Sequence, residues 1–272
     1  MKIGVLISIN RSTDIAQEFR KVRDLDLQSC QVCMWDPSLY TEEVASAIQK
    51  AAADTGIGIS TLWAGWSGPA VWDFYEGPIT LGLVPAAYRA HRAQELCAAS
   101  DFAVKLGVEN IASHVGFLPE NPNDPDFMGV IAVLRYVTGY MRDRGQHFLF
   151  ETGQETPTTL VRAMEEVGTG NIGVNFDTAN LILYGKAATP DAARLLAKYV
   201  RDVHCKDGLF PTDGRYLGKE VPLGQGRADM PSTLRILLEA GYQGPLTIER
   251  EISGEEQIRD ILMARDYLRS LL

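Results

Sequence analysis

The chain has 272 residues, of which 46% are hydrophobic, and a formal net charge of −9 with a pI of about 5.0. This length and hydrophobic content are sufficient for one large α/β domain with a sizeable core. The acidic balance disfavours a nucleic-acid partner, which usually needs a basic face against the phosphates. No window approaches 18 uninterrupted apolar residues, so we expect no membrane span.

Short apolar runs recur along the chain, and most are followed by a helical pattern. The first run is too short for the apolar core of a signal peptide and is typical of a first strand. The predicted strands are Ile3–Ile9, Ser29–Met34, Gly58–Leu62, Asn110–His114, Phe148–Glu151, Gly173–Asp177, Val200–His204 and Leu246–Glu249. The helical patterns cover residues 13–25, 41–56, 87–107, 126–145, 156–168, 189–200, 230–241 and 255–272. Several helical patterns start at Thr, Asp or Pro and end at Gly, which are ordinary helix signals.

Eight alternating β/α units in a chain of this length predict a single (β/α)₈ TIM barrel, with residues 1–272 as one domain. A doubly wound open sheet is the alternative, but no G-x-G-x-x-G follows the first strand. The two long irregular stretches, residues 64–85 and 208–227, follow the third and seventh strands. Barrel enzymes place active-site loops at these positions.

The four cysteines (Cys30, Cys33, Cys97 and Cys205) are too few for a disulfide scaffold in a chain this long, and they fit a reducing cytoplasm. Cys30 and Cys33 have the C-x-x-C spacing of zinc and redox sites. However, they lie in a predicted strand, where positions three apart face opposite sides. No second C-x-x-C completes a zinc site. We therefore interpret both as ordinary core residues.

Five consecutive predicted strands end on a side chain that can bind a cation: His114, Glu151, Asp177, His204 and Glu249. Any one of them alone is explained by a hydrogen-bonded core histidine, a helix cap or a surface charge. In a barrel, however, the carboxyl ends of the strands meet at one mouth. Three carboxylates buried together are costly unless a cation compensates them. Carboxylates and an imidazole suit Mn²⁺, Mg²⁺, Co²⁺ or Zn²⁺.

The segments "ETGQE", "NFDTAN", "VHCKDG", "VPLGQG" and "TIEREI", in this order, resemble the xylose-isomerase-like TIM barrels. This family comprises sugar and sugar-phosphate isomerases and epimerases, and the resemblance covers essentially the whole chain. It implies one divalent metal ion held by Glu151, Asp177, His204 and Glu249. It also implies an aldose–ketose isomerase or ketose epimerase that acts on a small sugar.

The residue types are compatible with the chemistry that the resemblance implies. Sugar isomerisation removes a proton from the carbon next to a carbonyl, forms an enediolate and returns a proton elsewhere. A metal ion would stabilise the developing oxyanion. Glu151 and Glu249, on opposite sides of the substrate, are the predicted acid–base pair.

Further predicted substrate contacts lie near these strand ends: His114, Lys206, Gln225, Trp66 and Arg215. His114 would bind substrate or orient Glu151, and Lys206 would hold a substrate oxygen or pair with a carboxylate. Gln225 stands where relatives often carry Glu, which leaves an acid–base role there in doubt.

The remaining contacts have simple structural alternatives. Trp66 would join Trp63 and Trp72 in an aromatic wall against a sugar face, or would simply pack. Arg215 lies in the long loop after the seventh strand, where it would meet an anion or remain solvated. Glu251 is a candidate partner of Glu249, and Tyr184 and Lys186 are interpreted as loop residues.

Three other functions remain open. Related abasic-site endonucleases use three metals and need more histidines than the four in this chain, and Asn180 stands where they carry histidine. A non-catalytic sugar-binding protein need not keep a complete metal quartet. A lyase or dehydratase acting on a keto-sugar or cyclitol would share the metal and the enediolate. Because no clear anion site is present, we favour a non-phosphorylated sugar, and long loops at the mouth allow a homo-oligomer.

Overall fold

The computed structural model describes residues 1–272 and contains a closed barrel of eight parallel strands. The strands are β1 (Ile3–Ser8), β2 (Ser29–Met34), β3 (Gly58–Ala64), β4 (Asn110–Ser113), β5 (His147–Glu151), β6 (Ile172–Asp177), β7 (Val200–Cys205) and β10 (Leu246–Ile248). The barrel closes where β1 pairs with β10 through Ile3 and Leu246. The prediction of a (β/α)₈ barrel is confirmed, with every strand within two residues of its predicted ends.

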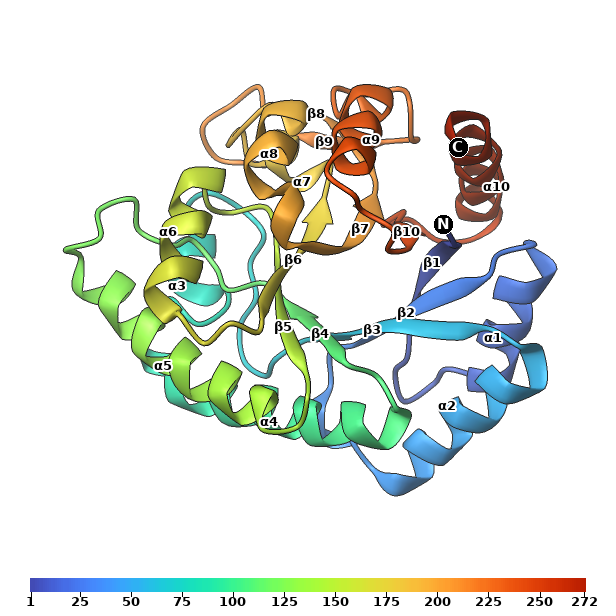
Figure 1. The fold of residues 1–272 in the computed structure, drawn as a ribbon, viewed down its shortest axis with the longest axis horizontal. Helices are drawn as coiled ribbons and strands as arrows, with labels where there is room; N and C mark the ends of the chain where they lie inside the picture. Colours follow the sequence, from blue (N-terminus) through green and yellow to red (C-terminus); the bar gives the residue numbers. More distant parts are fainter.

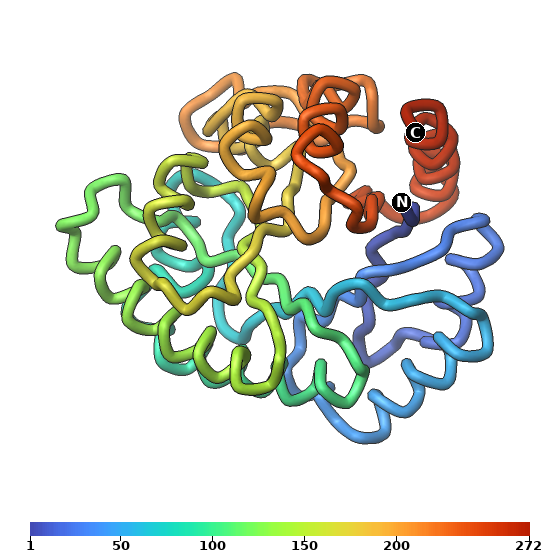
Figure 2. The backbone as a smooth tube through the Cα atoms, viewed as in Figure 1, coloured from blue at the N-terminus to red at the C-terminus, as the bar shows by residue number.

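Helices surround the strands (Figure 1). They are α1 (Ile15–Asp24), α2 (Glu42–Thr55), α3 (Gly77–Thr80), α4 (Ala86–Leu106), α5 (Pro125–Arg142), α6 (Pro157–Val167), α7 (Asn180–Leu183), α8 (Thr189–Leu196), α9 (Met230–Glu239) and α10 (Glu255–Leu271), with 3₁₀ turns η1 (Pro37–Leu39) and η2 (Ala197–Tyr199). None of them is both long enough and apolar enough to cross a membrane. Helix α10 packs against β1 and β10, so the two chain ends lie near each other (Figure 2).

The helix boundaries follow the expected signals. The hydroxyl of Thr156 accepts a hydrogen bond from the backbone N–H of Thr159 at the start of α6. The helix ends at Gly168, whose φ of 66° lies in the left-handed region that favours glycine. Helix α2 uses the same pair of signals at Thr41 and Gly56.

The main apolar core lies between the strands and the helices, whereas the barrel interior below the mouth is polar. Asp202 on β7 accepts hydrogen bonds from Ser60 and Thr61, across the barrel on β3, and from Thr247 on β10. All four side chains are buried or half-buried. Because the bonds from β3 cross the barrel to β7, they fix these side chains inside it, and the polar groups satisfy one another.

The two long irregular stretches carry short elements that the sequence pattern did not predict. Strands β8 (Asp207–Leu209) and β9 (Lys219–Val221) form an antiparallel pair after β7, and α3 lies in the loop after β3. An isolated bridge between Asp73 and Tyr216 joins the two stretches. Both loops therefore form the rim of the barrel mouth, as expected.

Candidate metal centre

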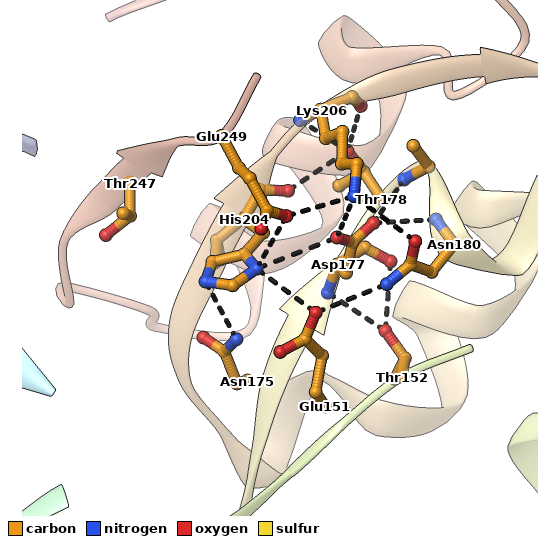
Figure 3. Close-up of polar contacts among 12 residues, drawn as sticks. Glu151, Thr152, Asn175, Asp177, Thr178, Asn180, His204, Lys206, Thr247 and Glu249 are labelled. Atoms are coloured by element: carbon orange, nitrogen blue, oxygen red, sulfur yellow. Dashed lines mark hydrogen bonds and ion pairs between the residues drawn. The ribbon is translucent and has the colours of Figure 1, made fainter. Parts of the chain in front are cut away.

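Four adjacent strands bring Glu151, Asp177, His204 and Glu249 together at the barrel mouth (Figure 3). Glu151 and Asp177 are the last residues of β5 and β6, His204 pairs with Asp177 in the register, and Glu249 follows β10. One potential ligand atom from each residue lies within 4.8 Å of the others. Parallel pairing explains this convergence, because it places the carboxyl ends of all strands at the same edge.

Asp177 is held in place by the chain that follows it. Its Oδ1 accepts hydrogen bonds from the backbone N–H groups of Ala179 and Asn180, at 2.8 and 2.6 Å. Its Oδ2 is buried and has no hydrogen-bond partner. Burial raises the pKa of this carboxyl group to about 7, although Lys206 and His204 oppose the rise. One oxygen is thus fixed by the backbone, and the other is free to bind a cation.

Glu151 receives hydrogen bonds from two elements of the mouth. The indole N–H of Trp63 donates to Oε2, and the side-chain amide of Asn180 donates to Oε1 at 3.2 Å. The Nε2 atom of His114 lies 3.4 Å from the same Oε1. Burial alone would raise the pKa of Glu151, but His114 and His204 outweigh it, so the pKa is lowered. This carboxylate is therefore ionised and oriented.

The Nδ1 atom of His204 is the point on which the three carboxylates converge. It lies 3.1 Å from Oε2 of Glu249, 3.4 Å from Oε1 of Glu151 and 3.6 Å from Oδ2 of Asp177. Nδ1 has no hydrogen-bond partner, and the imidazole is fully buried. A buried imidazole nitrogen, a free buried carboxylate oxygen and two further carboxylates form a donor set that fits one divalent cation.

Lys206 supplies the nearest fixed positive charge. Its Nζ lies 3.1 Å from Oε2 of Glu249, 2.9 Å from Oε1 of Glu251 and 3.7 Å from Oδ2 of Asp177. Burial would raise the pKa of Glu249, but Lys206 and His204 outweigh it and lower the pKa well below its usual value. Glu251 thus contacts the same ammonium as Glu249.

A cavity of about 400 Å³ opens at Glu151 and Glu249, two of the four candidate ligands. Glu151 and Glu249 form part of its floor, and Trp35, Trp63 and Trp72 contribute an aromatic wall. The ring centroid of Trp35 lies 4.9 Å from that of Trp63 and 6.0 Å from that of Trp72. No arginine or lysine lines the cavity. The site therefore pairs an acidic floor with an apolar wall.

The predicted substrate contacts occupy different places around this cavity. His114 lines it, and Lys206 is buried beside Glu249 without lining it. Trp66 packs behind the wall, with its ring centroid 5.1 Å from that of Trp35. Gln225 is exposed, and Arg215 is exposed between the rings of Tyr75 and Tyr216. The structure thus does not bring Gln225 and Arg215 to the cavity, and a role for them in substrate binding stays a prediction.

Sequence reasoning missed two aromatic residues of the cavity. Trp35 follows β2, which does not end on a charged residue. Its position directly after a barrel strand was the signal that could have identified it. Tyr184, interpreted as a loop residue, is buried, lines the cavity and accepts a hydrogen bond from the side chain of Gln154 at 3.1 Å. The short helix α7 turns Tyr184 inward, and no periodicity in the sequence shows this.

The interpretation of Cys30 and Cys33 as core residues on opposite faces of a strand agrees with the structure. All four cysteines are free and buried. Cys30 packs in the main core outside the barrel, whereas Cys33 lines the cavity inside it, so the two face opposite sides of β2.

Comparison with known proteins gives a consistent result. A family described as "Xylose isomerase-like TIM barrel" matches residues 19–271. The crystal structure of a xylose isomerase domain protein from Planctomyces limnophilus is 37% identical, with a TM-score of 0.92 over 99% of this chain and 96% of that chain. A D-psicose 3-epimerase crystallised in the presence of D-fructose is 18% identical, with a TM-score of 0.72 over 100% of this chain and 99% of that chain.

One curated relative is more distant. It is the uncharacterized protein MJ1311 of Methanocaldococcus jannaschii, which is 22% identical over 175 residues. The match covers 64% of this chain and 44% of that protein, so the chain corresponds to less than half of its length.

Proposed function

The chain belongs to the xylose isomerase-like TIM barrel family, and we propose that it is a divalent-metal-dependent isomerase or epimerase of a small, non-phosphorylated sugar or keto-sugar. The observation that carries this proposal is the placement of Glu151 and Glu249. Both carboxylates face one cavity, and both lie within 3.4 Å of the same imidazole nitrogen. Two carboxyl groups at one substrate-sized cavity can accept a proton from a sugar carbon and return one, which sugar isomerisation and epimerisation require.

The residues that would hold the metal ion are Glu151, Asp177, His204 and Glu249. Their free donor atoms support Mn²⁺, Mg²⁺, Co²⁺ or Zn²⁺ over softer ions, because three of the four donors are carboxylate oxygens. When bound, such an ion supplies Lewis-acid stabilisation of negative charge on substrate oxygens.

The chain's own groups would move the proton. Glu151 or Glu249 would accept the proton from the carbon next to the carbonyl, and in isomerisation the carboxylic acid so formed would return it to the neighbouring carbon. In epimerisation the other glutamate, after taking up a proton from solvent, would donate it to the opposite face of the same carbon. Hydrogen bonds from Trp63 and Asn180 hold Glu151, and Lys206 holds Glu249. Each base is therefore fixed before substrate arrives, which reduces the reorganisation that proton transfer needs.

The cavity walls support a neutral sugar. The rings of Trp35, Trp63 and Trp72 offer apolar faces of the kind that stack on the C–H face of a sugar. A phosphate would meet an acidic floor and no lining cation, which is unfavourable. The four free, buried cysteines support a cytoplasmic setting.

Solvent deuterium exchange tests the proposal. The protein, freed of metal by a chelator and reloaded with Mn²⁺, Co²⁺, Mg²⁺ or Zn²⁺, would be incubated in D₂O with a panel of free ketoses and aldoses. We expect deuterium at a carbon next to the carbonyl of one substrate, only in a metal-loaded sample. Failure of every sugar and every metal to show exchange would contradict the proposal. Loss of water without exchange back to substrate would instead indicate a dehydratase.

A further inference from the structure

The second nitrogen of His204 points away from the cavity into the polar interior of the barrel. Its Nε2 lies 2.9 Å from Oε1 of Gln31 and 3.0 Å from Nδ2 of Asn175. Gln31 Nε2 in turn donates to Oδ1 of Asn175 at 3.0 Å. All three side chains have no exposed surface. A closed triangle of three polar groups thus lies directly beneath the candidate metal centre (Figure 3 shows Asn175 and His204).

Gln31 reaches this triangle from a distant strand. It lies on β2, whereas Asn175 and His204 lie on the adjacent strands β6 and β7, and β2 is not a neighbour of either strand in the barrel order. The contact therefore spans the barrel interior, and its partners are separated by 144 and 173 residues along the chain.

A neutral imidazole carries one proton, and its position decides which nitrogen can bind a cation. The Nδ1 atom faces three carboxylates, which attract a proton to it and would make it a donor rather than a ligand. The acceptor Oε1 of Gln31 favours the other tautomer, in which Nε2 carries the proton and Nδ1 has a free lone pair. In that tautomer the Asn175 amide must turn over, because its Nδ2 as placed faces Nε2 as a second donor.

We propose that Gln31 is a positioning residue of the metal centre: its Oε1 accepts a hydrogen bond from Nε2–H of His204 and thereby keeps the Nδ1 lone pair available to a divalent cation. This inference rests on the metal centre of the proposed function. Gln31 does not line the cavity and so acts only through His204.

An amide and a carboxylate at position 31 would have different effects on the triangle. If Nε2 of His204 carries a proton, the amides of Gln31 and Asn175 must both turn their oxygens towards it. Their NH₂ groups then face each other on the third side of the triangle. If Nε2 carries a lone pair instead, both amides turn their NH₂ groups towards it, and their two oxygens face each other. Two amides therefore leave one side of the triangle unsatisfied in every arrangement.

A carboxylate at position 31 would satisfy all three sides once the Asn175 amide turned over. It would also place a fourth negative charge near the three carboxylates of the centre. The amide keeps the acceptor that His204 needs without that charge.

Metal affinity measured without sugar tests the inference. Gln31→Met keeps the shape but removes the acceptor, and we expect it to bind Zn²⁺ about 10–100-fold more weakly in calorimetric titration. Gln31→Glu keeps the acceptor and should bind Zn²⁺ at least as tightly as the wild type. The control is Gln146→Met, which removes a buried glutamine bonded to Ser100 and Val108 outside the site and should leave the affinity unchanged.

Nitrogen-15 NMR of the Zn²⁺-loaded wild type gives a second readout, because the chain has only four histidines to assign. We expect the His204 proton on Nε2. A proton on Nδ1, an unchanged affinity in Gln31→Met, or a Gln31→Glu variant as weak as Gln31→Met would each overturn the inference. A wild type that does not bind Zn²⁺ at all would overturn the metal centre itself, and an intact centre with no sugar exchange would affect only the proposed reaction.

Discussion

The ammonium group of Lys206 lies 3.1 Å from Oε2 of Glu249, in a pair that is almost completely buried. Burial alone would lower the pKa of Lys206, but Glu249 and Glu251 outweigh it and raise the pKa well above its usual value. Lys206 is therefore charged, and it partly compensates the carboxylates at the barrel mouth. A metal ion bound to these carboxylates would also compensate their negative charge.

This pairing predicts how Lys206→Met behaves. Removing one partner of a buried ion pair leaves its carboxylates uncompensated, and we expect the metal-free protein to lose about 3–5 kcal/mol of unfolding free energy near neutral pH. Saturating Mn²⁺ or Zn²⁺ should recover part of the loss, because an ion that binds only the folded state stabilises it. Urea unfolding with and without metal measures both effects.

Lys219→Met is the matched control, because Lys219 is an exposed residue of β9. Its unfolding free energy should change by no more than about 0.5 kcal/mol. An equally small change in Lys206→Met would show that the stability of the metal-free protein does not depend on the charge of Lys206.

Glu249→Gln separates the proton-transfer role from folding. The amide retains the shape and one oxygen but cannot accept a proton, so deuterium exchange into substrate should fall at least about 10²-fold. Circular dichroism should show an unchanged fold. Glu239→Gln, on the exposed side of α9, is the control and should exchange at the wild-type rate. Wild-type exchange by Glu249→Gln would contradict the two-glutamate mechanism.

Much of this architecture was predictable because it depends on local patterns. Alternating apolar runs and capped helices indicate eight β/α units, and parallel pairing then forces the strand ends to one mouth. Glu151, Asp177, His204 and Glu249 could therefore be grouped from the sequence. Each of them ends an apolar run, and the carboxyl ends of parallel barrel strands meet at one mouth, so these two facts are enough to place them together.

The remaining parts depend on contacts that leave no local signal. Gln31 lies within a strand and acquires its meaning only from Asn175 and His204 across the barrel. Trp35 and Tyr184 face the cavity because of the orientation of the turns that carry them. Arg215 and Gln225 lie in the rim loop, whose conformation is set by the β8–β9 pair and the bridge to Asp73, and this conformation keeps them exposed.

Trp35→Ala should weaken sugar binding more than it slows the chemistry. Trp35 lines the cavity and is 39% exposed, so its removal takes away a stacking surface and does not open a closed core. Loss of an aromatic contact worth roughly 1 kcal/mol predicts an increase of several-fold in KM with little change in kcat. Trp35→Phe keeps an aromatic ring and should raise KM less than Trp35→Ala does. A fall in kcat at constant KM would instead place Trp35 in the proton-transfer step.

Glu155 gives a prediction about stability and pH that does not depend on substrate. This residue is buried, and its Oε1 has no hydrogen-bond partner. Burial raises its pKa from 4.5 to about 8, although its own backbone N–H and Lys186 oppose the rise. The folded state therefore holds the proton more tightly than the unfolded state. The stability contributed by this proton is complete below about pH 4.5 and is lost as pH rises towards about 8.

The variant Glu155→Gln cannot ionise and lacks this dependence. Between pH 5 and pH 8, we expect its unfolding free energy to rise relative to the wild type by about 1.4 kcal/mol per pH unit at most. Urea unfolding at several pH values, with a chelator present in all samples, measures this difference. Glu165→Gln, an exposed residue of α6, should keep a constant difference from the wild type. A constant difference for Glu155→Gln as well would show that Glu155 is ionised in the folded protein and that its burial is compensated.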